Sequence, residues 1–277
     1  SGHPYSWLPI GSMEDLDAAK LEDVHAWFKK HYGAANTVIV VAGDVNTDEV
    51  IAKVTHYFGE VEPGPPLTRR EAWVAKLTGT QTQISYDRVP QTMILKSWNT
   101  PGHSTKTSTY LDMVGNVLTS GKNSRLYQRL VYKEQLVSSV SAYVSGYEIA
   151  GTFEISAMVN PGIDEARVNA IIDEELAKFL DKGPTKKELE RIKIQNISGF
   201  VRALEKVGGF GGKSDLLASN YIYNGDPGFY KKDMEWVKNA TRDDLTDAAN
   251  AWLSDGLNHM EIRPYPKMQA SESTVDR

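Results

Sequence analysis

The residues whose spacing first suggests chemistry are GGFGGKS at positions 208–214. Glycines followed by Lys-Ser are typical of phosphate-binding loops, but a P-loop also needs a glycine five positions before its Gly-Lys pair. Counting back from Gly212 reaches Val207. A P-loop also follows a buried strand, whereas residues 188–207 carry apolar side chains at helical spacing. The stretch therefore does not favour a nucleotide site.

The histidines are the next candidates, because imidazoles about one helical turn apart can bind zinc. His25 and His31 lie six residues apart, which places them about 240° apart around a straight helix. They cannot share a metal ion in that geometry. Neither His-Glu-x-x-His nor His-x-x-Glu-His occurs, and we interpret the histidines as solvated or locally hydrogen-bonded: His3, His25, His31, His56, His103 and His259.

Candidate nucleophiles are equally sparse. The chain has no cysteine, which excludes thiol catalysis, disulfides and Cys-bound zinc. No Gly-x-Ser-x-Gly elbow occurs around Ser145-Gly146 or Ser198-Gly199. Acidic runs such as 173–175 and 243–244 fit the polar faces of helices. The residues alone therefore predict no catalytic residue and no metal ligand in this chain.

Composition indicates an ordinary globular protein of one or two domains: 277 residues, 40% hydrophobic, with a net charge of −5. No basic block suggests a nucleic-acid partner, and no apolar run approaches the roughly 20 residues of a membrane span. The first residues lack the features of a signal peptide and do not begin with Met, so we expect that residues preceding them have been removed.

Periodicity before residue 60 predicts a helix over 13–33, a strand over 37–45 that is buried on both faces, and a second helix over 47–60. Residues 60–70, EVEPGPPLTRR, read as a linker because prolines, glycine and charges occur there without periodicity. Two helices and one strand resemble the end of a domain whose beginning is missing.

After the linker the pattern restarts. We expect a hairpin over 138–160 that turns near Gly151, and a capping box in which Thr185 and Glu188 start a long helix. The other expected strands are 80–87, 92–98 and 257–265, and the other expected helices are 104–119, 123–135, 164–180, 225–240 and 241–253. This order predicts an α+β fold, with an antiparallel or mixed sheet and helices packed on one face.

Several stretches together resemble the bacterial branch of the insulinase/pitrilysin-type zinc peptidases, which share the mitochondrial-processing-peptidase fold. The stretches occur in the family's order and cover nearly the whole chain: GHPYSWLPIGSMEDL (2–16), NTVIVVAGDV (36–45), GKNSRLYQRLVYKEQLVSSVSA (121–142), GPTKKELER (183–191), and the glycine-rich region with its following NGDPG (208–228).

The resemblance implies a repeat unit of two similar α+β halves, the first of which binds zinc through His-x-x-Glu-His and uses the Glu as base. The Gly-His-Pro-Tyr stretch follows that motif in the family. We therefore expect residues 1–59 to end the first half, 60–79 to form the Pro-rich linker, 80–265 to form a catalytically inactive second half, and 266–277 to be a disordered tail. Zinc would belong to the full-length parent, with no cofactor in this chain.

The resemblance also bears on substrate binding. Second halves that grip substrate carry an Arg and a Tyr, and here Val131 and Ser138 occupy those positions. A valine cannot donate a charge-assisted hydrogen bond to a peptide carbonyl, and we do not expect Arg129 or Tyr132 to substitute. A second homologous unit that carries the Arg/Tyr pair is therefore the expected partner, besides the missing N-terminal part and a peptide substrate.

The glycine-rich stretch acquires a structural role in this interpretation. Since glycine permits positive φ and close approach of backbones, we hypothesise that Gly208, Gly209, Gly211 and Gly212 break the long helix and pack against a neighbouring element or the chamber wall. The alternative is a plain loop that ends a helix.

The resulting hypothesis is a non-catalytic C-terminal portion of a zinc metalloendopeptidase, inactive alone, that shapes the substrate chamber and docks a partner unit. The alternative is a non-peptidase scaffold or assembly subunit of the same fold. The resemblance favours a periplasmic or secreted location, with the cytoplasm as the alternative.

Overall fold

The computed structural model describes residues 2–66, 68–69 and 71–266. Two compact units are present. The sheet unit comprises Ala75–Ile192 and Ala240–Arg277, and the helical unit comprises Ser1–Val74 and Lys193–Asn239. The half-domain boundaries expected from the sequence stay a prediction, and the expected tail lies outside the described residues except for Pro266.

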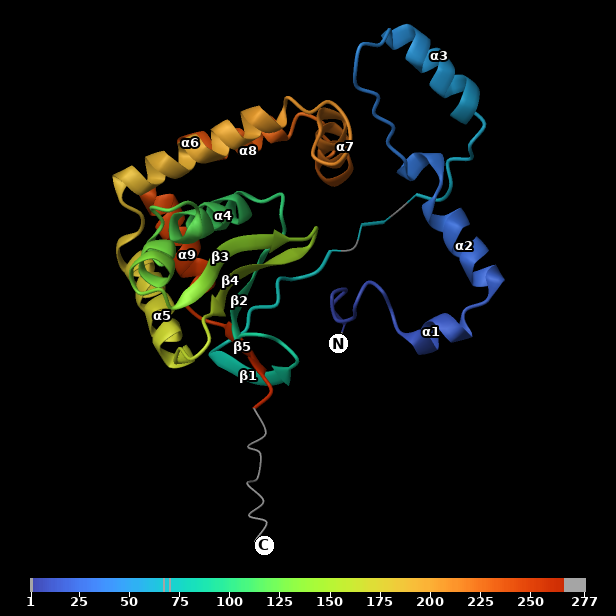
Figure 1. Cartoon of the computed structure of the whole chain (residues 1–277). Helices are drawn as coiled ribbons and strands as arrows, with labels where there is room; N and C mark the ends of the chain where they lie inside the picture. Colours follow the sequence, from blue (N-terminus) through green and yellow to red (C-terminus); the bar gives the residue numbers. More distant parts are fainter. Residues whose placement is uncertain (1, 67, 70, 267–277) are drawn as a thin grey trace, which may run out of the picture. The chain divides into compact units, whose positions relative to one another are not determined.

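A five-stranded mixed sheet is the centre of the sheet unit, with strand order β1-β5-β2-β4-β3 (Figure 1). β1 and β5 pair in parallel, and the other neighbouring strands pair antiparallel. The strands are β1 (Thr80–Asp87), β2 (Met93–Pro101), β3 (Val137–Gly146), β4 (Ala150–Val159) and β5 (Leu257–Pro264). The predicted fold class and the predicted hairpin are thereby confirmed.

Three helices cover one face of this sheet (Figure 1). They form because their buried residues recur at helical spacing, as with Val168, Ile172 and Phe179 on one side of a single helix. The covering helices are α4 (Lys106–Thr119), α5 (Glu165–Lys182) and α9 (Arg242–Leu253). A π-helical segment, η2 (Tyr127–Lys133), precedes β3. Its wider turn is visible in the hydrogen bond from the Glu134 amide to the Arg129 carbonyl, 3.0 Å.

Alternation along the two central strands creates the core. On β4, Phe153, Ile155 and Ala157 are buried, whereas the residues between them are partly exposed. β2 alternates in the same way, with Ile94 and Trp98 buried. Because successive side chains of a strand point to opposite faces, one face of the sheet packs under the helices and the other does not.

The predicted capping box is confirmed at the start of α6 (Lys186–Ala203). Glu188 accepts a hydrogen bond from the Thr185 amide at 2.7 Å, and the Glu188 amide donates to the Thr185 hydroxyl at 3.2 Å. Arg125 then donates two hydrogen bonds to the same carboxylate, at 2.8 and 2.9 Å. Burial acts to raise the pKa of Glu188, but these hydrogen bonds prevail and lower it to about 2.

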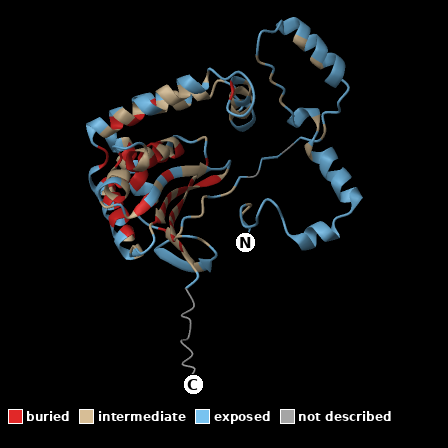
Figure 2. Cartoon of the chain, viewed as in Figure 1, coloured by how far each residue is buried: buried red, intermediate tan, exposed pale blue. Residues whose placement is uncertain are grey.

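The helical unit contains short amphipathic helices. None of the residues of α1, α2 or α3, all of them described, is buried. Its elements are α1 (Met13–Ala18), α2 (Leu21–His31), η1 (Ala34–Asn36), α3 (Thr47–Phe58), α7 (Lys213–Asn224) and α8 (Tyr230–Asn239), and α6 continues into it beyond Ile192. Figure 2 shows the contrast between this exposed N-terminal region and the buried core of the sheet unit.

Two sequence expectations are wrong in the helical unit. The single helix over 13–33 is two helices, because the Asp23 carboxylate accepts from the Lys20 amide at 3.0 Å and starts a new helix at Leu21. Residues 37–45 are not a buried strand: no described strand pairs with them, and Ile39 and Val41 are exposed. A β-branched run forms a ladder only when another strand lies beside it.

Replacing Phe153 with Ala should lower the free energy of unfolding by about 3–5 kcal/mol, because the ring is fully buried between sheet and helices. The control is Met158→Ala on the other face of the same strand, where a loss of only about 1 kcal/mol is expected. Urea denaturation measures both values, and equal losses would contradict a core confined to one face.

The Arg125–Glu188 contact predicts an acid-sensitive stability. Since the folded pKa of Glu188 is about 2 and the ordinary value is 4.5, its contribution should be complete above pH 4.5 and disappear as the pH falls towards 2. Glu188→Gln should remove on the order of 2 kcal/mol near pH 7 and little at pH 2. Urea denaturation between pH 2 and 7 measures this difference, and Glu190→Gln at an exposed position is the control. The prediction is wrong if the free energy of unfolding of the unchanged chain, of Glu188→Gln and of Glu190→Gln depends on pH in the same way.

Candidate functional site

The candidate site is the face of the sheet opposite α4, α5 and α9, here called the open face (Figure 1). Strand register brings polar side chains together there, with an apolar group at one end. The residues at these alternate positions are partly or fully exposed: Gln81, Gln83, Ser85, Asp87, Met93, Leu95, Ser97, Asn99, Ser139, Ser141, Tyr143, Ser145, Thr152, Glu154, Ser156, Met158, Asn258, Met260 and Ile262.

A carboxylate lies near the middle of the open face. Glu154 of β4 is directly opposite Tyr143 of β3 and Ser97 of β2. The Tyr143 hydroxyl donates to Glu154 Oε2 at 3.1 Å, and the Thr152 hydroxyl donates to Glu154 Oε1 at 2.8 Å. The hydrogen bond to Glu154 raises the pKa of Tyr143. No sequence motif marks Glu154, although the alternation of side chains along 150–159 indicates the face on which it lies.

The basic residues of the strands lie on the opposite, helix-covered face. Lys96 is buried and its Nζ contacts Asp173 of α5 at 2.5 Å. Arg263 contacts Glu261 at 2.5 Å, and His259 lies 3.3 Å from the same residue. Burial, followed by the charge of Lys96, lowers the pKa of His259, so the imidazole is neutral near pH 7.

The two positions expected to replace the Arg/Tyr pair flank the start of β3. Val131 lies in η2 and is half-buried. Ser138 is exposed, and its Oγ accepts a hydrogen bond from Gln91 Nε2 at 3.0 Å and donates to the Met158 carbonyl at 3.4 Å. Neither side chain carries a charge, so neither can form a charge-assisted hydrogen bond with a peptide carbonyl.

Arg129 and Tyr132, the neighbouring residues considered as substitutes, differ in whether an ion pair already holds the side chain. The Arg129 guanidinium contacts Glu174 at 2.7 Å and Glu175 at 2.8 Å, both on α5. Arg129 would have to leave two carboxylates to reach a peptide. Tyr132 is 69% exposed and lies outside this ion pair.

The histidines are dispersed over the structure. His25 and His31 share α2, as expected, whereas His3 contacts the Trp73 carbonyl and His103 contacts the Tyr147 carbonyl. Among the described residues, no group of three His, Cys, Asp or Glu side chains could hold a metal ion. The described side chains therefore do not fit a zinc site, and no catalytic step is assigned to them.

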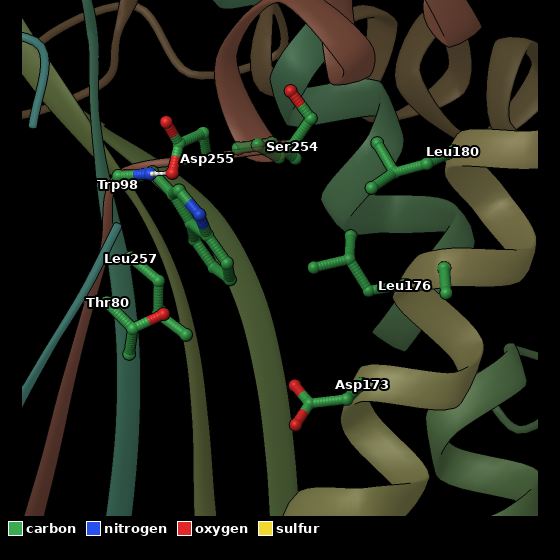
Figure 3. Close-up of a pocket in the computed structure, with 11 residues that line it drawn as sticks. Thr80, Trp98, Asp173, Leu176, Leu180, Ser254, Asp255 and Leu257 are labelled. Carbon is green, nitrogen blue, oxygen red and sulfur yellow. Dashed lines mark hydrogen bonds between the residues drawn. The ribbon is translucent and has the colours of Figure 1, made fainter. Parts of the chain in front are cut away.

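A cavity of about 200 Å³ lies between α5 and the end of the sheet (Figure 3). Leu176 and Leu180 point into it from α5, towards Trp98. The acidic groups at its rim already have partners: Asp173 contacts Lys96, and Asp255 accepts from the Gly79 and Gly256 amides. Its lining is mainly apolar, and the Ser254 hydroxyl in it donates to the Asn250 carbonyl at 2.6 Å.

The glycine-rich stretch forms a hydrogen-bonded loop between α6 and α7. Gly209 and Gly211 have φ of 72° and 74°, and Gly211 donates to the Asp215 carboxylate at 2.9 Å. Lys206 Nζ donates to the Phe210 carbonyl at 2.6 Å, and the Phe210 side chain is 94% exposed. Gly208 and Gly212 complete the loop, and its packing against a chamber wall stays a prediction.

In the described part of the chain, no helix could span a membrane.

Alanine at Gly209 and Gly211 should destabilise this loop by about 1 kcal/mol per site, because positive φ is unfavourable for a residue with Cβ. Hydrogen exchange of the amides of 206–214 should accelerate. Gly208→Ala is the control, since its φ is not positive and an added Cβ meets no atom within 4 Å. Unchanged exchange in the double variant, with unchanged peptidase activity of the full-length protein, would remove any special role of these glycines.

Comparisons with known proteins match this architecture. Residues 18–196 match the family model described as "Peptidase M16 inactive domain". The chain is 25% identical to "Zinc protease PqqE" of Helicobacter pylori over 91% of its length and 57% of the relative's. It is 27% identical to an "Uncharacterized zinc protease" of Rickettsia felis, covering 92% of the chain and 60% of the relative. The chain thus spans less than two thirds of the length of these relatives.

Solved structures share the fold. A protease from Helicobacter pylori matches with a TM-score of 0.81 and 25% identity, covering 95% of this chain and 63% of that one. A peptidase M16 inactive domain from Pseudomonas fluorescens matches with a TM-score of 0.78 and 20% identity, covering 96% and 62%. The resemblance to insulinase/pitrilysin-type zinc peptidases is confirmed: the chain belongs to the peptidase M16 family and carries its inactive domain.

Proposed function

We propose that this chain is the non-catalytic C-terminal portion of a zinc metalloendopeptidase, and that it shapes the chamber in which the parent hydrolyses peptide bonds with a zinc-activated water. The observation that carries the proposal is the open face of the sheet, in a chain that carries an inactive peptidase domain. A wide, mostly polar face without a covering layer is suited to contact a hydrated, extended polypeptide. The relatives named zinc proteases support zinc in the parent.

The exposed apolar surface of the helical unit supports a further part of the proposal. Trp27 and Phe28 of α2 are 53% and 49% exposed, and residues 37–45 have no described strand beside them. Apolar helix faces and unpaired extended segments are stable when another polypeptide covers them. The proposed cover is the N-terminal part of the same protein, corresponding to the portion of the relatives that this chain does not span.

We propose a second homologous unit as the partner that grips substrate. The support is local: Val131 and Ser138 carry no charge, and the Arg129 guanidinium is already paired with α5. An Arg/Tyr pair supplied across the chamber would provide the missing donors to the peptide backbone.

The proposed location is the periplasm or the extracellular space, with the cytoplasm as the alternative. A chain described as "the periplasmic protease PqqL from Escherichia coli" shares the fold with a TM-score of 0.59 and 18% identity over 80% of this chain. Fractionation of cells by osmotic shock would decide between the compartments.

The alternative function is a scaffold or assembly subunit without peptidase activity. It is retained because a chain of Complex III2 from Candida albicans has the same fold, with a TM-score of 0.75 and 14% identity over 91% of this chain. The two functions differ in whether the full-length protein binds zinc and cleaves peptides.

The decisive measurement compares the 277-residue chain with the full-length protein. After dialysis against zinc, elemental analysis should find no stoichiometric zinc in the chain alone and one ion in the full-length protein. An unstructured fluorogenic peptide should be cleaved only by the full-length protein, and a chelator should stop the reaction.

The zinc content and the cleavage of the peptide distinguish the two candidate functions. Stoichiometric zinc or cleavage by the 277-residue chain alone would overturn the non-catalytic assignment. A full-length protein that folds but neither binds zinc nor cleaves would favour the scaffold.

A further inference from the structure

The open face carries negative charge without compensating positive charge. Among the strand positions that point to it, Glu154 and the terminal Asp87 of β1 are acidic, and none is Lys, Arg or His in the five described strands. Basic strand residues all point under the helices. The strand positions of this face therefore contribute negative charge only, and negative charge favours cations.

Glu154 also differs from the carboxylates of the helix-covered side. There, Glu188 contacts Arg125, Glu261 contacts Arg263, and Glu175 contacts Arg129. Within the described residues Glu154 has no such basic contact, and its hydrogen-bond donors are the neutral hydroxyls of Tyr143 and Thr152. A half-buried carboxylate with neutral partners retains much of its capacity to bind a cation, because desolvation is already partly complete before the cation arrives.

The geometry around Glu154 suits a planar cation. The hydroxyls of Tyr143 and Thr152 each take one carboxylate oxygen, and each oxygen keeps a further lone pair. A guanidinium donates two parallel hydrogen bonds to such a carboxylate, and the adjacent Tyr143 ring, 44% exposed, offers a face on which the same group can stack. An ammonium group would gain the charge interaction but lose the planar match.

We propose that Glu154 and Tyr143 form a subsite on the chamber wall that binds an arginine side chain of the peptide substrate. This inference rests on the proposed function, because it names the class of peptide that the open face would hold. Glu154 supplies charge and two acceptors, Tyr143 supplies the stacking face, and Thr152 holds the carboxylate in place. The subsite would act as a determinant of specificity and would take no part in bond cleavage.

The test measures binding to the 277-residue chain, so it needs no peptidase activity. The probes are two fluorescein-labelled peptides of alanine, serine and glutamine that differ at one central residue, either arginine or its uncharged isostere citrulline. Fluorescence anisotropy at low salt should give a Kd about tenfold lower for the arginine peptide, as expected for charge-assisted hydrogen bonds. A lysine peptide should bind with an intermediate Kd. Raising NaCl from about 0.05 to about 0.3 M should reduce the preference.

The matched variants are Glu154→Gln, which keeps the shape of the side chain, and Glu190→Gln, which removes the same charge from an exposed site on α6. The first should make the two Kd values equal within about twofold, and the second should keep the tenfold preference. Urea denaturation of each variant verifies folding.

Three outcomes would overturn the subsite: equal Kd values for arginine and citrulline in the unchanged chain, a preference that survives Glu154→Gln, or no binding of either peptide at millimolar concentration. Equal Kd values and the absence of binding are both measured on the unchanged chain, so the subsite can be refuted even if the Glu154→Gln variant does not fold. An inactive full-length protein would defeat the proposed function, while an active one that cleaves arginine and citrulline peptides equally would defeat only the subsite.

Discussion

Alternation of side chains along β2 and β4 is the constraint from which the rest of the sheet unit follows. A strand presents successive side chains to opposite faces, so one set of positions packs under α4, α5 and α9 while the other set does not. Phe153, Ile155 and Trp98 are buried because they occupy the first set. The uncovered set contains serine, threonine, asparagine and glutamine, which do not require burial. The same alternation thus provides a buried core on one face and a mostly polar surface on the other.

The placement of charges obeys this division. Lys96 is almost completely buried, and a buried ammonium is tolerated only beside a counter-charge, which Asp173 supplies from α5. Glu261 and Arg263 satisfy each other on the same side. On the uncovered side Glu154 remains in contact with water, so neutral hydroxyls are sufficient to hold it. Helix packing therefore determines which charges must be paired within the chain and which can be directed outward.

Much of the fold could be predicted from the sequence where the pattern is local. The run 138–160 predicts the hairpin of β3 and β4, and the Thr185–Glu188 spacing predicts the start of α6, because both signals depend on a few neighbouring residues. The elements that were predicted wrongly depend on contacts that apolar periodicity does not show. The helix over 13–33 divides where Asp23 bonds the Lys20 amide, a choice that apolar spacing does not reveal.

Site prediction was limited in another way. Histidine spacing and the absence of cysteine were readable from the sequence, because metal ligands need particular residue types. Glu154 was not singled out, since a lone acidic residue in a strand has no motif. Its character depends on strand register, which places Tyr143 of β3 beside it, and on the absence of a basic residue among the open-face positions of the described strands. Both properties arise only when distant segments pair.

Residues 37–45 are a second case in which a local sequence pattern depends on pairing with a distant segment. The run TVIVVAGDV has the composition of a strand buried on both faces, yet no described strand pairs with it and Val41 is 50% exposed. Helices α2 and α3 likewise have apolar sides and no buried residue. Burial of apolar area stabilises by roughly 25 cal/mol per Å², and the apolar surfaces of these segments do not contribute that stabilisation while they lie in water. A composition fitted to burial on both sides, in a segment that lies open, is the observation behind the proposed cover by another part of the same protein.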